Sequence, residues 1–410
     1  MLTKLYKKPA DRYSRELAKS RLAEENEASA ANSNVNDETA SLVLDETASS
    51  TPAVQAPDTP PVPTFNRQAK LLSHLDRIVE WRETGITAPV MVVLDPTFKC
   101  NHRCPGCHGL MGQAYDTIPI ERIRTLVQEL AEVGVRSMPL GGGGDPSCHP
   151  DLAEILQITH DAGIETGFYT NGELLKQPVI DTIANTCEWI RISLDADGPE
   201  IHQRVHGASK NAFDKVVRNM ERIQAARKKS GKKMVFGAGY LVRPDTMSGM
   251  YGAAKLCRDI GLDYLRIRPF FGYDNKPLCN EQEADAIVQE LERCSTLETD
   301  SFSVNSPAHR MDWLATGDTK VQGVKCNIHH FTTHIGGDLK VYLCCHTVGW
   351  EKYCLGDLSE QSFSEIWYSD RRREIFENIN YRDCATPCSM AAFNQVLSLF
   401  DSPVEHNNFL

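Results

Sequence analysis

Three cysteines stand close together in one short segment of the 410-residue chain. Cys100, Cys104 and Cys107 form a C-x3-C-x2-C array, and thiolates at this spacing bind zinc or an iron–sulfur cluster from a single loop. An electron-transfer [4Fe–4S] cluster takes four cysteines, so three would leave one iron open to a substrate. The array therefore predicts a reactive metal centre, and a zinc site completed by His102 or His108 is the alternative.

A run of four glycines, Gly141 to Gly144, leads into Asp145 and Pro146. Glycines let backbone N–H and C=O groups approach a ligand closely. A carboxylate at the end of the run can accept charge-assisted hydrogen bonds from an ammonium group. A phosphate-binding loop would need Lys-Ser or Lys-Thr after the glycines, and neither follows. We therefore expect this tract to hold a ligand through its backbone and through Asp145.

Further cysteines gather near the carboxyl end of the sequence: Cys326, Cys344, Cys345, Cys354, Cys384 and Cys388. Four thiolates from separated segments can close a metal site that stabilises a small domain with little core of its own. The spacing alone leaves both a structural zinc ion and an iron–sulfur cluster open. The sequence therefore predicts a second metal centre in this region.

Short β-branched runs alternate with amphipathic helical patterns between residues 90 and 268. Strands are expected at residues 90–94, 137–140, 165–169, 189–194, 234–242 and 264–268, with helices between them. This alternation indicates a parallel sheet covered by helices, and six units favour a partial (β/α)6 TIM-like barrel over a full barrel of eight. Ligands then bind at the carboxyl ends of the strands, where the cysteine array and the glycine tract both lie.

The rest of the chain divides by composition. Residues 24–58 hold eight acidic residues and no Lys or Arg, so residues 1–67 are expected to form a largely disordered tail. The barrel should span residues 68–275, followed by a connecting segment at 276–325. Residues 326–410 should form a small cysteine-rich domain, with a hairpin turn at Gly336 and Gly337 leading into a strand at 340–343.

Charge and hydropathy exclude two classes of partner. A formal net charge of −11 argues against a nucleic-acid binder, because such proteins neutralise phosphates with Lys and Arg. No apolar run reaches the roughly 18 residues that a membrane span needs. Fourteen cysteines without a secretory core fit metal or redox ligands better than a disulfide framework. We expect a cytoplasmic protein.

The first cysteine array, placed after the first strand of a partial barrel, resembles the radical S-adenosylmethionine (SAM) superfamily. The glycine tract is similar to the family's glycine-rich motif, although Asp145 stands where Glu is usual. Ser193-Leu194-Asp195 resembles the family's serine-containing segment after the fourth strand. Together these motifs cover about residues 90 to 269. The resemblance implies a SAM-binding [4Fe–4S] cluster on Cys100, Cys104 and Cys107.

The same resemblance implies which residues contact SAM: Gly141, Gly142, Gly143, Asp145, Asn171, Ser193, Asp195 and Arg204. Two positions depart from the family pattern. Gly106 stands where an aromatic residue commonly precedes the third cysteine. The family's basic residue after the serine motif aligns best with His206, but Arg204 is preferred because a guanidinium grips a carboxylate bidentately.

The carboxyl-terminal cysteines resemble those of SPASM/twitch domains, which hold an auxiliary [4Fe–4S] cluster in many radical SAM enzymes. On that resemblance the ligands are Cys326, Cys344, Cys384 and Cys388. Cys345 could take the place of Cys344, and a zinc site on the same thiolates remains the alternative.

The resemblance further implies that reductive cleavage of SAM yields a 5′-deoxyadenosyl radical, which takes a hydrogen atom from a substrate carbon. We expect a two-electron oxidation or oxidative bond formation, with the auxiliary cluster as electron acceptor. The substrate would be a small molecule or a peptide, and the electron donor a flavodoxin or ferredoxin.

Three alternatives remain. The enzyme could introduce thioether or carbon–carbon cross-links into a peptide. It could also be a redox-neutral epimerase, with Cys148 giving a hydrogen atom to the substrate radical, although a packed Cys148 thiol is the simpler interpretation. In a different class, the chain would be a zinc-binding scaffold without catalysis.

Overall fold

The computed structural model describes residues 68–107, 116–270, 279–306, 325–380, 383–384, 388 and 390–401. The tail expected at residues 1–67 therefore lies outside the described residues. None of the described helices is long and apolar enough to cross a membrane.

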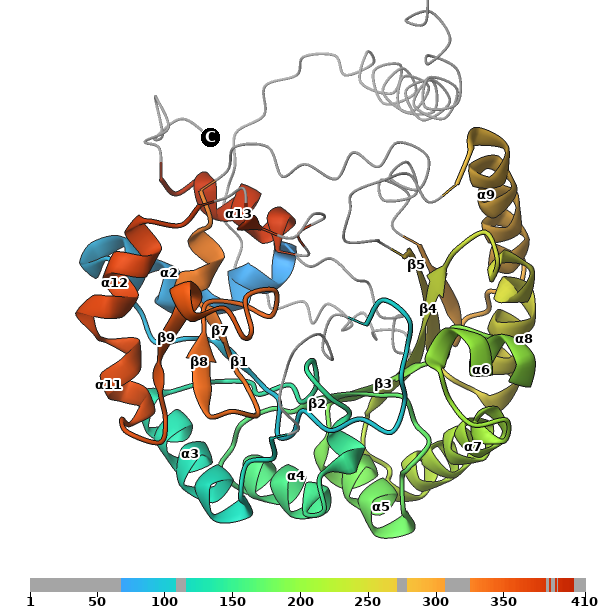
Figure 1. The fold of residues 1–410 in the computed structure, drawn as a ribbon, viewed down its shortest axis with the longest axis horizontal. Coiled ribbons are helices and arrows are strands. Elements are labelled where there is room, and N and C mark those ends of the chain that lie inside the picture. Colours follow the sequence, from blue (N-terminus) through green and yellow to red (C-terminus); the bar gives the residue numbers. More distant parts are fainter. Residues whose placement is uncertain are drawn as a thin grey trace, which may run out of the picture. The chain divides into compact units, whose positions relative to one another are not determined.

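A parallel sheet forms the larger part of the described structure (Figure 1). Its strands are β1 (Met91–Leu94), β2 (Gly167–Thr170), β3 (Trp189–Ser193), β4 (Val235–Val242), β5 (Tyr264–Pro269) and β6 (Ser303–Asn305). Strands β2 to β6 pair in sequence order, each parallel to the next. The expected strand at residues 137–140 joins β1 to β2 through isolated bridges at Ser137 and Leu140. Together with helices on one side, this confirms the partial barrel.

The helices that follow these strands cover the outer side of the sheet (Figure 1). They are α3 (Ile120–Val133), α4 (Leu152–Asp161), α5 (Gln177–Thr186), α6 (Pro199–His206), α7 (Ala212–Ser230), α8 (Met250–Ile260) and α9 (Glu281–Ser295).

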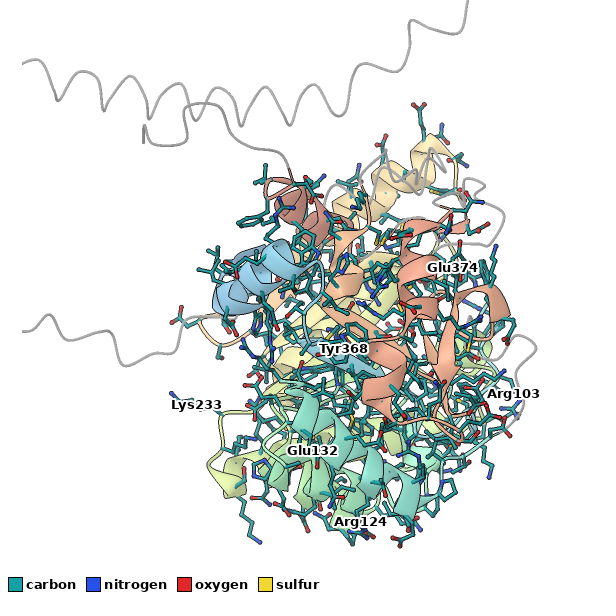
Figure 2. The ribbon with its side chains drawn as sticks, turned by 90° about the vertical axis from the view of Figure 1, so that its left-hand side faces the viewer. Arg103, Arg124, Glu132, Lys233, Tyr368 and Glu374 are labelled. Atoms are coloured by element: carbon teal, nitrogen blue, oxygen red, sulfur yellow. The ribbon has the colours of Figure 1, made fainter. Side chains whose placement is uncertain are left out.

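Side chains point alternately to the two faces of a strand, so every second side chain packs against the helices that cover the sheet. On β3, Ile190 and Ile192 are fully buried in the same core as Ile180 and Ile183 of α5. Burying one such side chain contributes about 1.5–3 kcal/mol. Arg124 and Glu132 on α3 are exposed and lie at the outer surface (Figure 2).

The alternation of helix and strand continues past the six expected units. Helix α9 and strand β6 lie in the segment expected to be a connection, and β6 pairs in parallel with β5 from Ser303 to Asn305. The strand is only three residues long and none of its residues is fully buried, so its composition carries little signal.

The carboxyl-terminal part extends the barrel sheet instead of standing apart from it. Strands β7 (Thr332–Ile335) and β8 (Lys340–Tyr342) form an antiparallel hairpin, as predicted, and β9 (Cys354–Asp357) pairs with β8. Strand β7 also pairs in parallel with β1, with Met91 opposite Thr332. This pairing places the second group of cysteines beside the first strand of the barrel.

Short helices belong to the carboxyl-terminal part: α11 (Phe363–Trp367), α12 (Asp370–Glu377) and α13 (Ala391–Ser398). Helix α2 (Leu75–Thr84), which precedes β1, packs with α13. Trp367 is fully buried and its indole N–H donates to the carbonyl oxygen of Thr87, at 2.8 Å. Trp81 of α2 packs with Phe331 and Leu397 in a second, smaller core. These contacts attach the carboxyl-terminal helices to the segment that precedes β1.

Candidate functional site

The three-cysteine array lies on the loop that leaves the carboxyl end of β1. Cys100, Cys104 and Cys107 are each partly buried and none forms a disulfide. The backbone N–H of Cys107 donates to the carbonyl of Cys104 at 3.1 Å, so the two residues share one turn. Burial, with smaller contributions from neighbouring charges that include the adjacent thiols, raises the pKa of Cys100 to about 11 and of Cys104 to about 12. Thiols this close need a metal's positive charge to be deprotonated together.

A buried carboxylate anchors this loop to the loop after β2. The side chain of Glu173 is 8% exposed. One of its oxygens, Oε2, lies 2.9 Å from both Asn101 Nδ2 and His102 Nε2, and the other lies 2.8 Å from Lys215 Nζ. Because Asn101 and His102 lie between the first two cysteines of the array, Glu173 fixes the conformation of that segment.

The glycine tract packs directly against the cysteine loop. The backbone N–H of Asp145 donates to the carbonyl of Lys99 at 2.9 Å. A Cβ atom on Gly144 would lie 2.5 Å from that same carbonyl oxygen, and one on Gly143 would lie 2.5 Å from the Phe98 ring. The tract therefore needs glycine to pack against residues 97–99, which lead directly into Cys100.

Asp145 is buried, and protein groups already saturate its carboxylate. Oδ1 accepts from the backbone N–H and the hydroxyl of Ser147 and from the hydroxyl of Thr170. Oδ2 accepts from the backbone N–H of Asn171 at 2.6 Å. The side chain of Asn171 in turn donates to Asn101 Oδ1 at 2.8 Å. Asp145 and Asn171 thus lie together beside the cysteine loop, as the sequence predicted for one site, with Asp145 joining the loops.

Ser193 and Asp195 lie at the carboxyl end of β3, on the same edge of the sheet. Ser193 is exposed, whereas Asp195 is buried and has a left-handed backbone conformation, with φ of 52°. Burial raises the pKa of Asp195 to about 7, although its Oδ1 accepts from the backbone N–H of Leu241.

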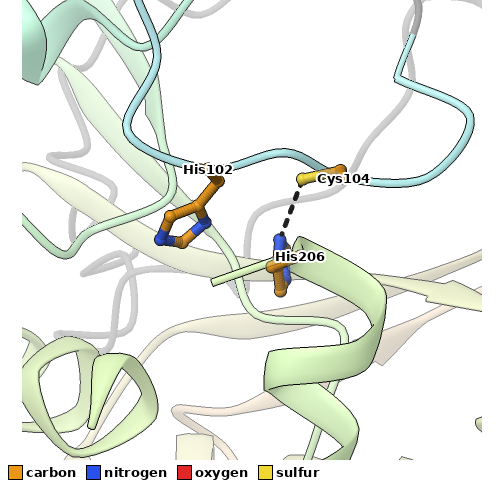
Figure 3. Close-up of side chains that lie close together, drawn as sticks. All are labelled: His102, Cys104 and His206. Carbon is orange, nitrogen blue, oxygen red and sulfur yellow. Dashed lines mark hydrogen bonds between the residues drawn. The ribbon is translucent and has the colours of Figure 1, made fainter. Parts of the chain in front are cut away.

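The structure distinguishes the two basic candidates on α6. Arg204 is exposed, and its guanidinium donates to the carbonyl of Asp245 at 2.8 Å. His206 is buried instead, and its Nδ1 lies 3.4 Å from the Sγ of Cys104 (Figure 3). The preference for Arg204 therefore rested on chemistry alone, and the position that aligned best is the one that contacts the cysteine loop.

Sequence reasoning missed a cluster of three buried histidines beside the array. The ring centroids of His102, His202 and His206 lie 4.4 to 5.7 Å apart. His102, Cys104 and His206 each offer a ligand atom within 4.8 Å of the others (Figure 3). His202 and His206 are four residues apart on α6, and this spacing was the available signal, since it places two side chains on one helix face.

Cys148 lies near the same loop. It is partly buried, and its Sγ is 3.8 Å from Asn101 Oδ1. Burial raises the pKa of this thiol to about 12. The thiol therefore stays protonated at neutral pH, which is the form that could give a hydrogen atom.

The second group of cysteines lines one apolar pocket whose walls also include residues of β1 and β7. Its walls include Cys326, Cys344, Cys345, Cys384 and Cys388. Protein donors face three of the sulfurs: Asn394 Nδ2 lies 3.3 Å from Cys326, Thr347 Oγ1 lies 3.9 Å from Cys344, and the Met390 N–H lies 3.4 Å from Cys388.

Four thiols, three of them with a donor directed at the sulfur, fit a [4Fe–4S] cluster, whose sulfurs are commonly hydrogen-bonded. Cys354 is buried but does not line the pocket; its thiol lies 3.5 Å from the Gly356 carbonyl instead. The four cysteines assigned from the sequence thus lie together, with Cys345 beside them.

Comparison with known proteins agrees with this geometry. Residues 94–256 match the Radical SAM superfamily model, and residues 326–389 match SPASM, an iron–sulfur cluster-binding domain. The two domains imply a SAM-binding [4Fe–4S] cluster, auxiliary iron–sulfur binding and SAM as cofactors.

Two curated relatives share part of the barrel. Mycofactocin maturase MftC of Mycobacterium ulcerans is 29% identical over 160 residues, which are 38% of this chain and 42% of that protein. PqqA peptide cyclase of Ruegeria pomeroyi is 30% identical over 129 residues, which are 30% of this chain and 34% of that protein. The chain thus matches only about two fifths or less of the length of these relatives.

A solved structure supports the fold. SuiB of Streptococcus suis, bound to its precursor peptide SuiA, superposes with a TM-score of 0.57 at 15% sequence identity, covering 89% of this chain and 81% of SuiB. With its cysteine loop, glycine tract and second group of thiols, the chain carries a radical SAM domain over residues 94–256 and a SPASM domain over residues 326–389.

Proposed function

We propose that the protein is a radical SAM enzyme that modifies a peptide. The observation that carries this proposal is the joint placement of three thiols, on Cys100, Cys104 and Cys107, against a glycine tract at the carboxyl ends of neighbouring strands. Three thiolates hold a [4Fe–4S] cluster and leave its fourth iron for SAM. With SAM bound, such a cluster supplies a 5′-deoxyadenosyl radical that takes a hydrogen atom from carbon.

The protein's own groups would orient SAM at this position. Gly141, Gly142 and Gly143 lead into Asp145, whose backbone N–H donates to Lys99 of the cysteine loop, and Ser193 and Asp195 lie at and just after the carboxyl end of β3. Because the carboxylate of Asp145 is already occupied by Ser147, Thr170 and Asn171, its role here is to hold the tract. The backbone of the tract is then the natural acceptor of the SAM ammonium group.

The pocket lined by Cys326, Cys344, Cys384 and Cys388 supports an oxidative reaction. A cluster held by four thiolates has no vacant iron for a substrate, and its natural use is to accept an electron. Cross-linking or dehydrogenation of a peptide removes one hydrogen atom, one proton and one electron, so it needs such an acceptor.

A peptide substrate is favoured over a small molecule by the relatives. The names of two curated relatives describe a maturase and a peptide cyclase, and SuiB was solved with a precursor peptide. These relatives share only part of their length with this chain, so the substrate class is our inference.

The test is a reaction between the anaerobically reconstituted protein, SAM, dithionite and the short peptides translated from reading frames next to the gene. We expect one 5′-deoxyadenosine per modified peptide and a peptide mass lower by two hydrogen atoms. Cys104→Ser should abolish both products. An unchanged peptide mass with deuterium gained from solvent would indicate epimerisation, and no peptide change at all would contradict the proposal.

A further inference from the structure

The inner face of the barrel sheet carries arginines and aromatic rings. Residues two apart along a strand share a face of the sheet. The face turned away from the helices carries Tyr169 on β2, Trp189 and Arg191 on β3, and Tyr264, Arg266 and Arg268 on β5. The four strands β2 to β5 contain no Asp or Glu. This face is therefore positively charged at its strand positions.

Arg191 lies at the centre of this face. Its Nε donates to the hydroxyl of Tyr264 at 3.1 Å, and its guanidinium carbon lies 5.0 Å from the centre of the Tyr169 ring and 5.8 Å from that of Trp189. Its contacts within the described residues are to the neutral side chains of Tyr169, Trp189 and Tyr264, and no carboxylate there forms an ion pair with it. A largely desolvated cation is costly unless an anion pairs with it, and cation–π contacts offset only part of that cost.

Glycines make room for these side chains. A Cβ atom on Gly237 of β4 would lie 2.2 Å from the Tyr264 ring, and one on Gly167 of β2 would lie 1.8 Å from Trp189. Gly239, the next inward position of β4, leaves Arg191 only an ordinary contact, at 3.6 Å. Large side chains on β3 and β5 therefore lie across small residues on the neighbouring strands β2 and β4, which builds a floor of rings around the Arg191 guanidinium.

Two more arginines stand next to this floor. Arg266 pairs with Gly239 in the strand register, directly beyond Ser193. Arg268 lies close enough to Asp195 to offset part of the rise that burial causes in the pKa of that carboxyl. Positive charge thus extends from Arg191 toward the carboxyl ends of the strands, where the cysteine loop lies. Tyr169 is 37% exposed, so solvent reaches the floor at this ring.

We propose that this inner face binds a carboxylate of the peptide substrate, with Arg191 as its contact residue. This inference rests on the proposed function and names the group by which the peptide is recognised. A planar guanidinium held over aromatic rings presents a fixed pair of N–H donors, which match the two oxygens of a carboxylate. The carboxylate can come from an acidic side chain or from the carboxyl terminus of the peptide.

The test measures peptide binding by calorimetry to the full-length protein with both clusters and SAM. Three probes are compared: acetyl-Gly-Glu-Gly-amide, acetyl-Gly-Gln-Gly-amide and acetyl-Gly-Gln-Gly with a free carboxylate. We expect at least one carboxylate probe to bind about tenfold more tightly than the neutral peptide, as expected for a charge-assisted hydrogen bond. Which probe gains identifies the source of the carboxylate.

Arg191→Gln should remove this preference, and Arg191→Lys should restore part of it. Arg293→Gln is the matched control, because Arg293 also lies over an aromatic ring, that of Tyr251 at 4.0 Å, but on the helix α9. Equal binding of all probes to the wild type, or a preference that survives in Arg191→Gln, would overturn the inference. Formation of 5′-deoxyadenosine by the wild type without peptide reports on the proposed function separately.

Discussion

The Nδ1 atom of His206 lies 3.4 Å from the Sγ atom of Cys104. The opposite ring nitrogen, Nε2, lies 3.2 Å from the carbonyl oxygen of Leu194, to which only an N–H can donate. A neutral His206 therefore presents an unprotonated Nδ1 to the thiol. The backbone N–H of Arg103 also donates to the carbonyl of His206, at 3.0 Å. Helix α6 and the cysteine loop are thus joined through both side chain and backbone.

The buried histidines beside this contact predict a pH dependence of stability. Burial lowers the pKa of His202 to about 4, whereas an unfolded histidine titrates near pH 6.5. Between these values the unfolded chain binds more protons than the folded one, so the stability contributed above about pH 6.5 is lost as the pH falls. In His202→Phe, the slope of unfolding free energy between pH 6.5 and 4 should be smaller by up to about 1.4 kcal/mol per pH unit.

Urea unfolding of the metal-free protein at several pH values measures this slope. His206 and Asp195 are present in both proteins, so only the part of the His206 contribution that depends on His202 adds to the difference between the two slopes. Identical slopes for wild type and His202→Phe would show that His202 takes up no proton on unfolding.

Gly144 should tolerate no side chain. A Cβ atom there would lie 2.5 to 2.6 Å from backbone atoms of residues 97 to 99, and backbone atoms cannot move aside as a flexible side chain can. Gly144→Ala should cost about 1–3 kcal/mol of stability and lower the iron bound at the three-cysteine site. Gly198→Ala is the control, since nothing lies within 4 Å of its Cβ position. Equal iron content in the two variants would contradict the close packing of tract and loop.

Glu173 should be needed to hold the cysteine loop before any cluster is present. Its carboxylate accepts from Asn101 and lies within hydrogen-bond distance of His102 and Lys215. A glutamine amide has one oxygen and one NH2 group, so it cannot accept hydrogen bonds at both positions of the carboxylate. Glu173→Gln should therefore cost about 1–3 kcal/mol of stability and raise the alkylation rate of Cys100 and Cys104 in the metal-free protein. Mass spectrometry of the alkylated peptides measures this rate. Glu83→Gln, at an exposed position, should leave it unchanged; equal rates in both variants would exclude an anchoring role.

The second group of cysteines should account for half of the iron. Two [4Fe–4S] clusters give about eight irons per chain, and Cys384→Ser should reduce this to about four. Cys354→Ser is the matched control, because Cys354 is buried outside the pocket and should keep all eight. A comparison of Cys344→Ser with Cys345→Ser decides which of these neighbours is the ligand. Full iron content in Cys384→Ser would rule out its assignment.

The barrel could be predicted from sequence because its strands are short apolar runs separated by amphipathic helices. The pairing of β7 with β1, by contrast, joins Met91 to Thr332 across 240 intervening positions, and no local pattern encodes such a contact. Strand β6 was missed since three partly buried residues, Ser303 to Asn305, carry too little periodicity.

Part of the candidate site could also be predicted from the sequence, and part could not. The cysteines could be assigned because their spacing reflects ligand geometry on one loop. The contact made by His206 depends on where α6 ends relative to that loop, so Arg204 could not be excluded from the sequence. The floor around Arg191 depends on inward-facing glycines such as Gly237, whose role appears only when neighbouring strands are aligned.

Radical formation at the three-cysteine site is tested most directly by measuring 5′-deoxyadenosine production by the anaerobically reconstituted, dithionite-reduced protein with SAM alone. We predict 5′-deoxyadenosine from the wild type and from Cys384→Ser, which keeps the first cluster, and none from Cys100→Ser, Cys104→Ser or Cys107→Ser. A wild-type protein that carries about eight irons and yields no 5′-deoxyadenosine would contradict the proposal that this site cleaves SAM.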